Sequence, residues 1–180
     1  MGRTFAIGGG AIAAIALLVT AAAPAGVAGK PQAPSAAQSA DTPTALLERI
    51  YAKFRKGSRN SLDPMQPPGD ARAFDPQLVR LLREETALSK DPQADPEGFF
   101  DEDIFCECQD TNHFRARIQL LSSAGDHARA EAQISDTGRR AVVRFDFVRV
   151  AGQWRIADII SSDGSSLRKD LTAYLRAAHR

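Results

Sequence analysis

The stretch 140–162 constrains the fold most strongly. Two runs rich in Val, Ile, Phe and Trp flank the dipeptide Ala151-Gly152. Alternating apolar runs around a short Gly-containing break predict a β-hairpin. With Arg149 opposite Trp154, Asp158 lies opposite Phe145 on the apolar face of this hairpin. That face is formed by Val143, Phe145, Phe147, Trp154, Ile156 and Ile160.

Residues 1–28 have the pattern of a secretory signal peptide. Arg3 precedes an apolar run over residues 5–23, and small residues follow up to Gly29. The run approaches the length of a membrane span, so an uncleaved anchor is the alternative, but its small residues favour cleavage. No Cys lies in the small-residue segment directly after the run, which argues against a lipoprotein. We therefore expect an exported protein, periplasmic or secreted, with residues 29–41 as a disordered linker.

The charge balance narrows the choice of partners. The chain has 23 basic and 22 acidic residues, and removal of Arg3 with the signal peptide leaves 22 of each. A near-neutral chain lacks the basic excess typical of nucleic-acid binders. It also argues against electrostatic attachment to anionic lipid, so the expected membrane contact is limited to the uncleaved signal peptide.

Residues 42–178 are expected to form a single α+β domain. Helical spacing of apolar residues predicts helices over 43–56, from Pro76 onward, and after Ser165 or Ser166. From Phe99 the period changes to two, which predicts an antiparallel meander of four strands, with 104–108 as a short fifth. Helices that cover one face of such a sheet define the α+β class.

The sequence resembles the nuclear-transport-factor-2-like superfamily, and within it the bacterial secreted family called domain of unknown function 3828. The resemblance covers about 43–177. It rests on four segments: the first helix (46–54), 106–110, Gly-Gln-Trp-Arg-Ile-Ala-Asp-Ile at 152–159, and Asp-Gly-Ser-Ser-Leu at 163–167. It implies a curved sheet wrapped around helices as a cone with a pocket. It implies no activity, cofactor or metal. The candidate pocket residues are Asp158, Trp154, Gln109, Asp110 and His113.

Asp158 has two interpretations. Loss of hydration on an apolar face raises the pKa of a carboxyl group and could make it an acid or base, with Gln109 or Asp110 orienting a substrate. Alternatively it is structural and accepts bonds from backbone amides or from an arginine such as Arg149 or Arg144, as most buried charges do. A three-residue turn would shift the register and place Asp158 opposite Arg144.

Cys106 and Cys108 also leave several interpretations open. In a strand their Cα atoms would lie near the upper limit for a disulfide, so a bond between them requires a turn or bulge. The oxidising compartment favours this bond. Two free thiols or a labile redox pair are the first alternative, and a metal site with Asp110 or His113 is the second. The sequence shows no recognisable catalytic triad or phosphate loop.

We expect a non-catalytic binding or interaction domain with a conical pocket. Its partner would be a small molecule or an envelope protein, and an immunity or inhibitor role is one version of the latter. A homodimer is compatible with the sequence. The alternative is a small pocket enzyme that performs proton transfer or hydration with Asp158 as base.

Overall fold

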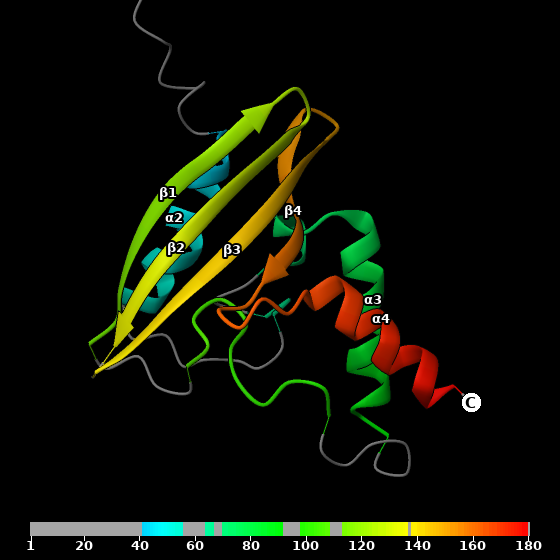
Figure 1. Cartoon of the computed structure of the whole chain (residues 1–180). Coiled ribbons are helices and arrows are strands. Elements are labelled where there is room, and N and C mark those ends of the chain that lie inside the picture. The colour runs from blue at the N-terminus through cyan, green and yellow to red at the C-terminus, as the bar shows by residue number, and fades with distance from the viewer. Residues whose placement is uncertain are drawn as a thin grey trace, which may run out of the picture. The chain divides into compact units, whose positions relative to one another are not determined.

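Four antiparallel strands follow one another in chain order in one sheet of the computed structural model (Figure 1). They are β1 (Arg115–Ala124), β2 (His127–Asp136), β3 (Arg139–Val150) and β4 (Gln153–Ile160). The structure describes residues 41–55, 64–66, 70–91, 98–108, 113–136 and 138–179. All of these belong to one compact unit, residues 34–180. The predicted signal peptide and nearly all of the linker lie outside the described residues.

The helices begin where the sequence provides caps. In α2 (Pro43–Arg55), the hydroxyl of Thr42 accepts a bond from the main-chain N–H of Ala45 at 3.0 Å. Asp75 caps α3 (Pro76–Leu88) and Ser166 caps α4 (Leu167–Ala178), while η1 (Ala71–Ala73) is a single 3-10 turn. Helices before and after an antiparallel meander confirm the α+β class. No helix in the described part of the chain is long and apolar enough to cross a membrane.

The turn between β3 and β4 has two residues. Ala151 and Gly152 have φ angles of 50° and 79°, which matches the left-handed two-residue turns that suit the twist of a hairpin. Arg149 therefore pairs with Trp154, as the sequence predicts. The three-residue alternative is wrong.

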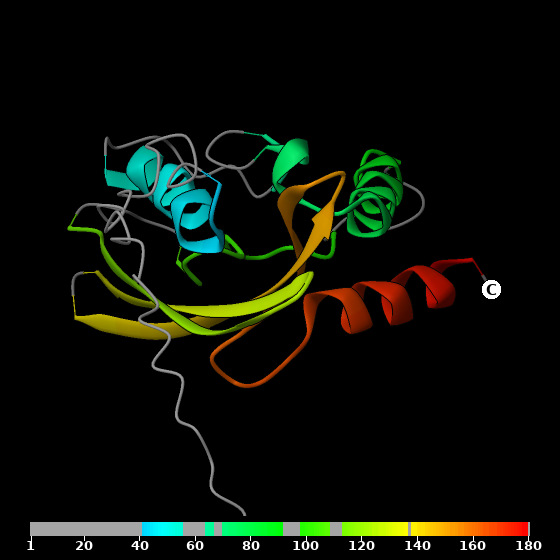
Figure 2. The same cartoon turned by 90° about the horizontal axis from the view of Figure 1, so that it is seen from above.

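The inner face of the sheet is filled by side chains. We use this name for the side against which α2 packs, and Figure 2 shows α2 over the concave side of the curved sheet. Three of the four buried side chains of β2 are alanines, which leaves room for rings from α2 and from the loop before β1. Ring centroids lie 5.1 to 6.5 Å apart among Tyr51, Phe54, Phe105, Phe114 and Phe145. The described residues therefore form a packed core where an open cone was expected.

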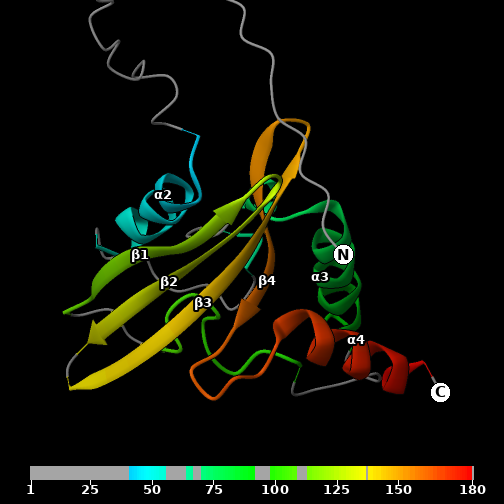
Figure 3. The same cartoon turned by 45° about the horizontal axis from the view of Figure 1, so that its top comes forward.

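One strand prediction is wrong, and one end of β1 is less covered than the central strands. Residues 104–108 form no strand and have only an isolated bridge between Asp103 and Cys108. Leu120 pairs with the buried Ala130 and so lies on the inner face, yet it is 45% exposed. The reason is that β1 lies at the edge of the sheet, as Figure 3 shows, and has a bulge between Leu120 and Ser122.

Candidate functional site

The predicted pocket residues are not brought together within the described part of the chain. Trp154 lies on the inner face, is 5% exposed, and has the guanidinium of Arg149 over its ring at 4.6 Å. Asp158 lies on the opposite, outer face. His113 is exposed before β1, where its main-chain N–H donates to Asp136 at 3.0 Å. Gln109 and Asp110 lie outside the described residues.

A β-bulge places Asp158 on the outer face. Phe147 pairs with Ile156, but the next pair is Asp146 with Asp158, so Ala157 is one extra residue in β4. One inserted residue exchanges the two faces of the strand beyond it. Ile159 therefore takes the buried position opposite Phe145, at 2% exposed, and the predictions that Asp158 and Ile160 lie on the apolar face are wrong.

Asp158 joins β4 to the first turn of α4. Its carboxylate accepts the hydroxyl of Ser166 at 2.6 Å and the main-chain N–H groups of Arg168 and Ile159, each at 2.9 Å. The N-terminus of a helix has unpaired N–H donors and a partial positive charge, so a carboxylate there is stabilising. The observed contacts are those of the structural interpretation of Asp158.

Arg168 is the centre of a network between α3, β4 and α4. Its guanidinium donates to the main-chain oxygen of Ala157, with Nε at 2.7 Å, and to the carboxylate of Asp75 at 2.9 Å. The bulge makes the oxygen of Ala157 available to this donor. The side chains of Arg168 and Asp75 are only 22% and 14% exposed, so their ion pair is weakly screened.

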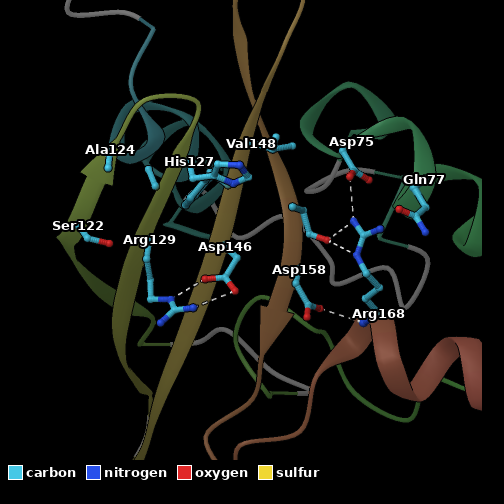
Figure 4. Close-up of a pocket in the computed structure, with 13 residues that line it drawn as sticks. Asp75, Gln77, Ser122, Ala124, His127, Arg129, Asp146, Val148, Asp158 and Arg168 are labelled. Atoms are coloured by element: carbon cyan, nitrogen blue, oxygen red, sulfur yellow. Dashed lines mark hydrogen bonds and ion pairs between the residues drawn. The ribbon is translucent and has the colours of Figure 1, made fainter.

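A groove opens on the outer face beside this network (Figure 4). Its volume is about 630 Å³. The floor is a row of paired residues that crosses all four strands: Ser122, Arg129, Asp146 and Asp158. Arg129 donates to Asp146 at 2.6 Å, so this charge pair is already formed in the free protein. His127 lines the groove from β2 and Gln77 lines it from α3.

The groove has fixed charges and three uncommitted polar groups. Arg129, Asp146, Asp158, Arg168 and Asp75 all bind one another or neighbouring main-chain groups. In contrast, the side chains of Ser122, His127 and Gln77 are exposed and form no bond to any described residue. The groove can therefore orient a polar partner. Its carboxylates, those of Asp75, Asp146 and Asp158, all accept bonds from other groups of the protein.

Sequence reasoning missed Arg168, although a signal was present. An arginine in the first turn of a helix is unfavourable next to the positive end of the helix dipole. Such a residue needs a nearby acceptor, and Asp75, recognisable as a helix cap, provides one. The sequence could not reveal the bulge that supplies the second acceptor.

The loop before β1 has the second set of candidates. Cys106 and Cys108 form a disulfide, with Cα atoms 5.1 Å apart in a turn in which Glu107 has a φ of 49°. A disulfide provides no thiolates for a metal. Among the described residues, no group of three His, Cys, Asp or Glu side chains could hold a metal ion.

Asp103 lies at the base of the same loop and is 3% exposed. Burial raises the pKa of its carboxyl group to about 7, helped by the charge of Glu102 and opposed by the N–H groups of Phe105 and Cys106. Burial also raises the pKa of Tyr51, whose hydroxyl donates to the main-chain oxygen of Phe105 at 2.7 Å. Neither Asp103 nor Tyr51 is among the residues that line the groove.

The likeness of this chain to known proteins is distant. No family model matches the sequence, and no curated protein matches it. In structure it is similar to the phospholipid-binding protein of Ralstonia solanacearum, solved in complex with a phospholipid. The TM-score is 0.37 and the identity is 10%, over 72% of this chain and 78% of that chain. A likeness of this degree carries no argument about ligand or function.

Proposed function

We propose that the protein is an exported, non-catalytic binding domain that holds a polar partner in the outer-face groove. The groove itself carries this proposal. It is open, it is lined from β2, β3, β4, α3 and α4, and its charges are fixed before a partner arrives. Preorganised polar groups reduce the cost of binding and favour specificity.

The partner best matched to an open polar groove is a segment of another envelope protein, and an immunity or inhibitor role is one form of this. A small apolar ligand would need an enclosed apolar cavity, whereas the inner face of the sheet is packed with rings. Asp158 as a catalytic base has less support, because its two oxygens accept three hydrogen bonds.

Export and superfamily membership are part of the same proposal. The disulfide between Cys106 and Cys108 supports an oxidising compartment. The order of helices followed by an antiparallel meander supports a nuclear-transport-factor-2-like domain, although the final helix departs from the usual layout of that superfamily. In this version of the fold the surface for recognition is the outside of the sheet.

Site-specific crosslinking tests the groove. A photoreactive benzophenone residue placed at position 127 should give a discrete adduct in an envelope extract. The same residue at position 113, also an exposed histidine but outside the groove, should not. An adduct pattern shared by both positions, or no adduct at position 127, would contradict the proposal.

A pair of variants tests two of the uncommitted groups. With the adduct partner identified, His127→Ala with Gln77→Ala should weaken its binding by about tenfold, as expected for two lost polar contacts. The matched control is His113→Ala with Gln119→Ala, which removes the same side chains from exposed positions outside the groove. Equal affinity of both variants would show that the groove does not form the contact.

A further inference from the structure

Three arginines gather on the outer face at the opposite end of the sheet. Arg115 and Arg117 lie two residues apart on β1, and Arg140 lies on β3. Ser135 of β2 pairs with both Arg115 and Arg140, so it lies between them in one row across the sheet. From strand spacings, the Cα atoms of Arg115 and Arg140 are about 10 Å apart, and those of Arg115 and Arg117 about 7 Å.

These arginines differ from others on the same face. Arg129 binds Asp146 at 2.6 Å and Arg144 lies 3.8 Å from Glu131. Arg155 donates to a main-chain oxygen and to Gln153. By contrast, the side chains of Arg115, Arg117 and Arg140 are exposed and form no ion pair or hydrogen bond with the described residues.

The three side chains line a shared depression of about 480 Å³. Gln133 and Ser135 contribute an amide and a hydroxyl to its floor, and Val142 gives an apolar side. No carboxylate lines it. Three like charges around one concave surface repel one another, and an anion between them would reverse this cost.

We propose that this depression, the arginine site, binds a phosphate group. A guanidinium pairs with a phosphate through two parallel N–H bonds, and a phosphate has enough oxygens to engage several arginines at once. A carboxylate has only two oxygens and one charge, so it matches three guanidinium groups less well. The hydroxyl of Ser135 adds a neutral donor at the centre of the row.

The phosphate could belong to a free molecule or to a lipid headgroup, and binding experiments separate the two sources. Inorganic phosphate is titrated into the full chain at low ionic strength, and chemical shifts of arginine side chains are followed. In a parallel arm, the protein is floated with vesicles of phosphatidylcholine alone or with 30% phosphatidylglycerol, a fraction chosen on the order of that in anionic membranes. Binding in either arm supports the site and names its source.

Variants test whether the arginine site is where phosphate or the anionic vesicles bind. A triple variant should lower the affinity for whichever of the two, inorganic phosphate or anionic vesicles, the protein binds, by at least about tenfold. This variant combines Arg115→Gln, Arg117→Gln and Arg140→Gln. The matched control removes the same three charges from exposed positions on α3 and α4, with Arg80→Gln, Arg83→Gln and Arg176→Gln. It should change the affinity by less than about twofold.

Three outcomes would overturn the arginine site. The first is no saturable binding of phosphate and no binding to anionic vesicles. The second is an equal loss of affinity in the two triple variants, which would indicate attraction by net charge alone. The third is a site variant that keeps its fold, judged by its circular dichroism, and also keeps its affinity. Because the site lies outside the groove, the crosslinking result at position 127 is independent of all three.

Discussion

Asp158 accepts three hydrogen bonds at the start of α4, and its loss should be felt as a loss of stability. In Asp158→Asn, only one oxygen remains for Ser166 and for two main-chain N–H groups. We expect the free energy of unfolding to fall by about 1–2 kcal/mol in urea titrations, as for other helix caps. Asp146→Asn is the control, because that carboxylate pairs on the surface with Arg129 and should matter less. Unchanged stability of Asp158→Asn would contradict the structural role.

Asp103 predicts a specific dependence of stability on pH. Its carboxyl group has a pKa of about 7 when folded, against 3.8 for the free side chain, so the folded protein holds this proton more tightly. The stabilisation that this bound proton gives to the folded state is greatest below pH 4 and is lost as the pH rises to about 7. Above that pH the buried group is ionised, at a cost of at most roughly 4 kcal/mol.

The substitution Asp103→Asn should therefore stabilise the protein at pH 8 and have little effect at pH 4. The amide oxygen of Asn can still accept a bond from the N–H of Phe105, which in the unsubstituted protein donates to the carboxylate of Asp103 at 2.8 Å. Thermal unfolding of both proteins over this pH range measures the difference. A constant difference across the range would mean that Asp103 does not titrate in it.

At the scale of elements, Arg168 holds three of them together. Arg168→Ala leaves Asp75 without its ion pair and the oxygen of Ala157 without its donor. We expect a loss of about 2–3 kcal/mol in the free energy of unfolding, because both groups are largely buried. Arg72→Ala is the control, since its pair with Asp70 is exposed, and should leave the stability unchanged. Equal losses of stability in Arg168→Ala and Arg72→Ala would contradict a stabilising role of Arg168 at the centre of the network.

The disulfide between Cys106 and Cys108, in the loop before β1, can be tested by thiol alkylation. Alkylation without reduction should add no mass at Cys106 and Cys108, and alkylation after reduction should add two groups. Replacement of both by Ala should cost roughly 1–2 kcal/mol, because the bond closes only a very short loop. Two thiols that react without reduction in the exported protein would contradict the disulfide.

Elements and their order could be predicted well, because they depend on local periodicity and caps. Pro43 and Pro76 begin helices, and the Arg149–Trp154 register follows from a two-residue turn. The face of Asp158 could not be predicted, since the extra residue Ala157 is favoured by a distant donor, Arg168. The candidate site therefore moved to the outer face because of one tertiary contact.

At the scale of the molecule, the distribution of charge matters more than its sum. The near-neutral net charge of the chain predicts no electrostatic attraction to anionic lipid. Yet Arg115, Arg117 and Arg140 lie together, while Asp101, Glu102 and Glu107 lie in the disulfide loop. A sum over the chain cannot report such separation, and a local basic surface can bind anions on a neutral protein.

The packing also predicts which parts open first. Ala130 and Phe145, on the inner face of the two central strands, are fully buried, whereas β1 is an edge strand with Leu121 42% exposed. Amide hydrogen exchange should be slowest in β2 and β3 and faster in β1 and in the last turn of α4. In Arg168→Ala, exchange should rise in α4 and near Asp75 while β2 and β3 stay protected. A uniform rise across all strands would instead indicate that α3 and α4 open only when the sheet does.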